Sequence, residues 1–247
     1  MNMHPQESRV IGIDAPNPRP PVWPAEAPTE TALGAARERP QSRGEERVNA
    51  AIHALGAALA LAAGMVLVER AAHTGSPLKV WCAAISSAAM MALYAVSAIY
   101  HILPAGGLKD RFQRLDRMMI AVFVAGSYTP VALLMVHATI GTLLCVIEWG
   151  LVALAVVFLW GDPGRYARRS EQLYRIMGWI TILAARPFFR HTPPAVLAAL
   201  GLAATCYGAG VALLVRDRVK YLHAAFHLLT LVGGGLQFWA ISRVVAS

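Results

Sequence analysis

Seven long apolar segments constrain this chain more than any other feature of its sequence. They cover approximately residues 49–68, 78–103, 115–136, 139–160, 172–189, 193–215 and 220–243. A helix needs about 20 apolar residues to cross the hydrocarbon core of a bilayer, and only the fifth segment is shorter than that. Because lipid offers no hydrogen bonds to an exposed backbone, such segments are expected to be helical. The pattern predicts an all-α integral membrane protein with seven transmembrane helices.

Composition separates the first part of the chain from the rest. The 247 residues are 57% hydrophobic and only 15% charged, whereas soluble proteins carry about 25% charged residues. Residues 1–44 hold eight of the 15 prolines, together with charges of both signs, and show no periodic apolar face. A segment of this kind cannot bury enough surface to offset its ordering entropy. We therefore expect a disordered cytoplasmic tail over 1–44 and a membrane domain over 45–247.

The distribution of Lys and Arg predicts the orientation of the chain. The tail and the gaps after the second, fourth and sixth segments hold 17 of the 22 basic residues, and the other side holds five. Because cytoplasmic loops carry the excess of Lys and Arg, the N-terminus is predicted to be cytoplasmic and the C-terminus outside. These residues lie between apolar segments rather than beside aromatic ones. The net charge of +8 therefore fits anionic membrane lipids better than nucleic acid.

Five polar residues of the apolar segments are predicted to meet near the cytoplasmic surface. His223 and His227 lie one helical turn apart at the start of the seventh segment, and Ser97 and His101 lie one turn apart near the end of the second. Asp116 begins the third segment. Three neutral histidines on a catalytic zinc leave one position open for water or substrate. We predict that His101, His223 and His227 bind zinc, that Asp116 holds the zinc-bound water or acts as general base, and that Ser97 supports them.

Several motifs, taken in order, resemble the haemolysin III branch of the progestin and adipoQ receptor (PAQR) family. They are Glu46-x-x-Asn49-x-x-x-His53, Ser97-Ala-Ile-Tyr-His101, Leu115-Asp116, Gly126-Ser-Tyr-Thr-Pro130 and His223-Ala-Ala-Phe-His227. The resemblance covers about residues 45–245. It implies a seven-helix fold with a cytoplasmic-side zinc on the same three histidines, with Asp116 at the metal water and Ser97 nearby. It also implies kinship with adiponectin receptors and alkaline ceramidases, a bacterial inner-membrane location, and a role in membrane-lipid homeostasis or haemolysis.

Three functions remain open at this point. The first hypothesis is a zinc-dependent hydrolase of lipid amide or ester bonds, or a sensor built on that chemistry. The second is a receptor or structural protein in which a non-catalytic zinc joins two helices. The third is a pore-forming cytolysin, although the apolar segments show no wide polar stripe that would line a pore.

Other polar residues carry weaker expectations. Glu148 lies midway along the fourth segment, where a carboxylate is either functional or a protonated side chain bonded to a neighbouring helix. Glu46 and Asn49 are expected to cap the first helix. The three cysteines lie in separate apolar segments, which indicates packing rather than a disulfide framework.

The predicted orientation can be tested with alkaline phosphatase, which is active only outside the cytoplasm. A fusion after Ser247 should be active, because an odd number of spans carries the C-terminus across the membrane. A control fusion after Ala105, in the gap between the second and third segments, should be inactive. Cytoplasmic retention of the Ser247 fusion would show that a span is missing or extra.

Overall fold

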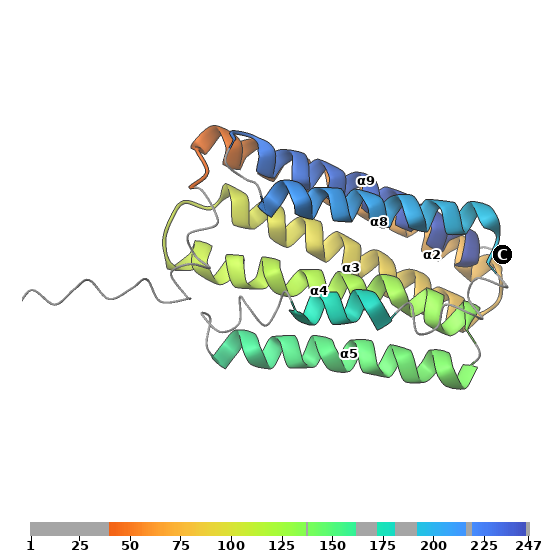
Figure 1. Cartoon of the computed structure of the whole chain (residues 1–247). Coiled ribbons are helices and arrows are strands. Elements are labelled where there is room, and N and C mark those ends of the chain that lie inside the picture. The colour runs from red at the N-terminus through yellow and green to blue at the C-terminus, as the bar shows by residue number, and fades with distance from the viewer. Residues whose placement is uncertain (1–39, 137, 162–171, 181–191, 216–218, 246–247) are drawn as a thin grey trace, which may run out of the picture.

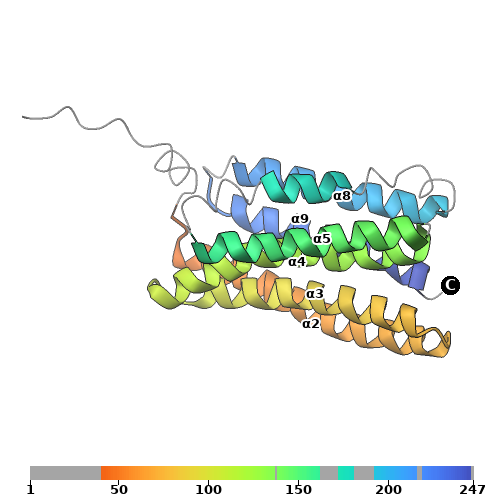
Figure 2. The same ribbon diagram turned by 90° about the horizontal axis from the view of Figure 1, so that it is seen from below.

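The computed structural model describes residues 40–136, 138–161, 172–180, 192–215 and 219–245 (Figure 1). Six helices in this part of the chain are long and apolar enough to cross a membrane. They are α2 (Arg43–His73), α3 (Pro77–Ile102), α4 (Gly107–Met135), α5 (Ala138–Gly161), α8 (Pro194–Val215) and α9 (Leu222–Val245). Their axes run along one common direction, as the view from below also shows (Figure 2). The chain is an all-α integral membrane protein.

These six helices correspond to six of the seven predicted segments. For the fifth, 172–189, residues 172–180 are helical, and residues 181–189 lie outside the described part of the chain. The seventh span and the orientation across the membrane therefore stay predictions. Residues 1–39 of the predicted tail also lie outside the described residues.

Two helices begin well before the apolar segments that predict them. The first begins at Arg43 rather than near residue 49, because Ser42 and Glu45 form a capping box. The Ser42 hydroxyl accepts a hydrogen bond from the Glu45 backbone N–H, and the Glu45 carboxylate accepts one from the Ser42 N–H. The expectation that Glu46 and Asn49 cap this helix is therefore wrong. Similarly, α4 begins at Gly107, well before residue 115, because hydropathy marks the membrane boundary rather than the end of the helix.

Short connections make consecutive helices antiparallel. Residues 74–76 join α2 to α3, and Gly75 takes the left-handed conformation that this turn requires, with φ of 69°. Residues 103–106 join α3 to α4, and Pro104 disfavours helical geometry for the residue before it. As a result, one end of the bundle contains the starts of α2, α4 and α9 and the end of α3 (Figure 1, left). We call this the histidine end.

Close packing places α9 against its neighbours. It contacts α2, α3, α4 and α8. A Cβ atom at Gly234 would overlap the hydroxyl group of Tyr94, so only glycine permits this approach of α9 to α3. Below the histidine end an apolar cluster packs between α2, α3 and α4, and it consists of Ala60, Met90, Leu93, Tyr94 and Phe123. The outward faces are apolar too, as membrane-facing surfaces must be, with exposed side chains that include Leu55, Leu59, Met65, Trp81, Val157 and Trp179.

The contact between α3 and α4 can be tested at Gly126. An added methyl group would overlap the side chain of Ala89, which has no rotamer to change, so Gly126→Ala should destabilise the protein by about 1–3 kcal/mol. Gly150 on α5 has no described atom within 4 Å of an added Cβ, so Gly150→Ala should be neutral or stabilising by about 0.5–1 kcal/mol. Thermal unfolding in detergent compares the two variants. Equal stability of both would contradict this packing.

Candidate metal centre

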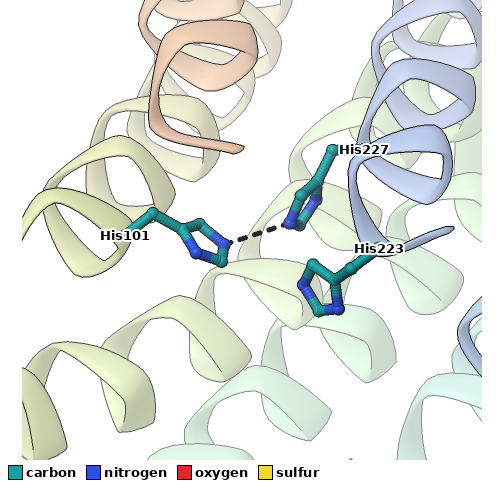
Figure 3. Close-up of side chains that lie close together, drawn as sticks. All are labelled: His101, His223 and His227. Atoms are coloured by element: carbon teal, nitrogen blue, oxygen red, sulfur yellow. Dashed lines mark hydrogen bonds between the residues drawn. The ribbon is translucent and has the colours of Figure 1, made fainter. Parts of the chain in front are cut away.

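Two helices bring three histidines together at the histidine end. His101 comes from the last turn of α3, and His223 and His227 come from the first two turns of α9. Figure 3 shows the rings of the two helices facing one another. One ring nitrogen of each histidine lies within 4.8 Å of the others. His101 and His227 are 4% and 5% exposed, so these two rings are shielded from solvent, whereas His223 is half-buried.

The distance between the two buried rings fits a metal ion. The Nε2 atoms of His101 and His227 are 3.0 Å apart (Figure 3). Without a metal, one of these nitrogens must carry a proton and donate a hydrogen bond to the other. Two imidazole ligands of a tetrahedral zinc, each with a Zn–N distance near 2.0–2.1 Å, are about 3.3 Å apart. Imidazole nitrogens are ligands for zinc and for several other transition metals, so this group could hold a metal ion.

Glu46 of α2 holds the outer side of His101. Its Oε2 atom lies 2.6 Å from His101 Nδ1, and its Oε1 atom accepts a hydrogen bond from Lys109 Nζ at 2.8 Å. Lys109 also donates to the backbone oxygens of Tyr100 and Leu103, each at 3.2 Å. These contacts join α2, the end of α3 and the start of α4 around His101.

His53 of α2 holds the outer side of His227. Its Nε2 atom is 2.7 Å from His227 Nδ1, and its side chain is buried. The sequence places His53 on the predicted cytoplasmic side but does not assign it a contact. A signal was present, since Glu46, Asn49 and His53 are spaced by three and four residues and therefore share one face of α2.

Ser97 and Asp116 lie near the histidine end, but neither is part of the converging histidine group. Ser97 is 2% exposed and precedes His101 by one turn on the same helix. Asp116 is half-buried on α4. Among the described residues, the group of side chains that converge closely enough to share a metal consists of the three histidines alone. The catalytic roles of Ser97 and Asp116 stay predictions.

Glu148 lies apart from this group, in the middle of α5. Its side chain is 0% exposed, and neither carboxyl oxygen has a hydrogen bond among the described residues. Leu144 and Val152, one turn away on either side, belong to apolar clusters formed with α4. The expected bond to a neighbouring helix is therefore not formed within the described part of the chain.

Comparison with known proteins assigns the chain to a family. A sequence model described as "Haemolysin-III related" matches residues 41–238, which include all of the side chains discussed above. The chain belongs to the haemolysin-III-related family. The resemblance noted in the sequence is thereby confirmed, and the six helices agree with a multi-pass membrane protein of this family.

Two bacterial relatives are similar over most of their length. The "Hemolysin-3 homolog" of Bacillus subtilis (strain 168) is 30% identical over 197 residues, which are 80% of this chain and 92% of the relative. The "Hemolysin-3" of Bacillus cereus is 27% identical over 197 residues, which are 80% of this chain and 90% of the relative. The likeness thus extends over the membrane domain as a whole rather than over one motif.

Metal analysis tests the histidine group directly. Purified protein should carry about one zinc per chain, and His227→Ala should lose it because His227 is the buried ligand closest to His101. His73→Ala is the control, since His73 lies in the last turn of α2 at the other end of the bundle. Mass spectrometry of the metal after gel filtration measures both. Full zinc occupancy in a triple variant, His101→Ala with His223→Ala and His227→Ala, would rule out this site.

Proposed function

We propose that this protein is a zinc-dependent hydrolase of lipid amide or ester bonds that acts in membrane-lipid homeostasis. The observation that carries the proposal is a group of three histidines, two buried and one half-buried, at one end of a membrane-spanning bundle. Catalytic zinc sites characteristically use three protein ligands and leave a fourth position open. A site at this depth suits a substrate whose polar head reaches the histidines while its chains stay between the helices.

Each predicted site residue has a role in this reaction. His101, His223 and His227 would hold the zinc, which when bound polarises a carbonyl group and activates water near neutral pH. Asp116 accepts a proton as the water oxygen bonds to the carbonyl carbon. It then returns the proton to the departing nitrogen or oxygen as the amide or ester bond breaks, so the products are a carboxylic acid and an amine or alcohol. Ser97 donates a hydrogen bond that orients the substrate.

Asp116→Asn tests the general-base role. Asn has a similar shape but cannot take the proton, so turnover should fall by about 10²–10⁴-fold while zinc stays bound. Asp110→Asn is the matched control, because Asp110 is exposed in the first turn of the same helix. Hydrolysis of a panel of ceramides and phospholipids in lipid nanodiscs measures the rates. If zinc removal stops turnover but Asp116→Asn does not, Asp116 has no part in the mechanism.

The same assay separates hydrolysis from a receptor or structural role. A structural zinc would stabilise the join between α3 and α9 without turnover. Equal, undetectable rates for untreated and zinc-stripped protein across the whole panel would therefore favour that role.

Pore formation is the second candidate, because the relative from Bacillus cereus carries the name Hemolysin-3. The apolar cluster of α2, α3 and α4 below the histidine end counts against a water-filled path through the described helices. Ion conductance across liposomes that contain only the purified protein tests it. Conductance that persists after zinc removal would favour a cytolysin over a hydrolase.

Charge and family together support a proposal for the location. We place the protein in the inner membrane of a bacterium, with the histidine end toward the cytoplasm, where the excess of Lys and Arg lies. In that orientation the zinc faces anionic lipid headgroups of the cytoplasmic leaflet.

A further inference from the structure

We propose that α2, which supplies no metal ligand, positions the metal centre by accepting a hydrogen bond from each of the two buried ligands. Glu46 accepts from Nδ1–H of His101, and His53 accepts from Nδ1–H of His227. This inference rests on the zinc site of the proposed function and assigns positioning residues to it.

The position of the two Nε2 atoms determines the tautomer of each ring. The Nε2 atoms of His101 and His227 approach one another to 3.0 Å, so these are the atoms that face a shared metal. A neutral imidazole that gives its Nε2 lone pair to a metal carries its proton on Nδ1. Because both rings are buried, solvent cannot accept these two Nδ1–H groups, and the protein must do so.

Glu46 can only accept a hydrogen bond from His101, and its other contacts hold the carboxylate in position. A carboxylate has no proton to donate, and its Oε2 atom lies 2.6 Å from His101 Nδ1. Lys109 binds the other oxygen at 2.8 Å and also holds the last carbonyls of α3, so the carboxylate is fixed relative to the helix that carries His101. A carboxylate–histidine–metal chain of this kind orients the ring and makes it a better ligand.

His53 repeats this arrangement with a neutral acceptor. Its Nε2 atom lies 2.7 Å from His227 Nδ1, and acceptance there requires the His53 proton to be on Nδ1. That Nδ1 atom is buried without a hydrogen bond among the described residues, and so are both amide atoms of Asn49, one turn earlier on α2. Asn49 lies on the same face of α2 as His53, and the proposed hydrogen bonds run from the metal through His227 to His53.

Zinc affinity tests the inference through two substitutions that keep the side-chain size. Glu46→Gln replaces the carboxylate with a neutral amide, which cannot accept from both His101 and Lys109, and His53→Phe removes the acceptor. Glu46→Gln and His53→Phe should each weaken zinc binding by about 10–100-fold, the usual effect of losing the hydrogen-bond partner of a ligand. The matched controls are Glu69→Gln and His73→Phe, which change exposed residues of the same type on the same helix. Competition with a fluorescent chelator measures affinity, and thermal unfolding of the zinc-free forms shows that folding is retained.

A second measurement needs no substitution. In zinc-loaded protein labelled with ¹⁵N-histidine, NMR should show His101 and His227 bound through Nε2 with protons on Nδ1, and His53 protonated on Nδ1. Metal bound through Nδ1 of either ligand overturns the inference. So does wild-type zinc affinity in both Glu46→Gln and His53→Phe. Failure of the wild-type protein to bind zinc instead overturns the proposed function itself.

Discussion

The 3.0 Å approach of the His101 and His227 Nε2 atoms sets requirements that the surrounding bundle has to meet. The two nitrogens belong to different helices, the end of α3 and the start of α9, so the geometry of the site depends on how these helices pack. Both rings are buried, where an uncompensated charge or an unpaired polar atom is costly. The contacts of α2 with both rings and the close packing of α9 can each be understood from the needs of this one pair.

Packing in lipid cannot rely on the hydrophobic effect between helices, because lipid chains are as apolar as leucine. Small residues instead allow close van der Waals packing between the helices. Glycine at position 234 lets α9 approach the Tyr94 side of α3, and glycine at position 126 lets α4 approach Ala89 on the same helix. A shift of α9 relative to α3 would change the separation of the His101 and His227 ring nitrogens.

The sequence predicted the parts of this structure that depend on spacing within one helix. His223 and His227 lie one turn apart, and the Lys and Arg count places His101 at the same end of the bundle. Glu46 and His53 were assigned no contact with the site, because their roles depend on the rotation of α2 about its axis. Most of α2 is apolar on every side, so its hydropathy does not encode that rotation.

Helix ends were the other weak point of the prediction. Ser42 was assigned to the tail on composition, although its hydroxyl forms the cap of α2 together with Glu45. The charged turns at the start of α4 continue the helix beyond the apolar segment, so Asp116 lies inside α4 rather than at its start. The length of an apolar segment reflects the thickness of the hydrocarbon core. Capping residues and the next proline or glycine instead decide where the helix begins and ends.

The most direct test of the central claim is X-ray absorption spectroscopy at the zinc edge of the purified protein. The account predicts a four-coordinate zinc with three imidazole nitrogens at about 2.0–2.1 Å and one oxygen in the open position. The imidazole signal should come from three rings, as the convergence of His101, His223 and His227 requires. Sulfur ligands, fewer than three imidazoles or a shell of oxygens alone would contradict the account.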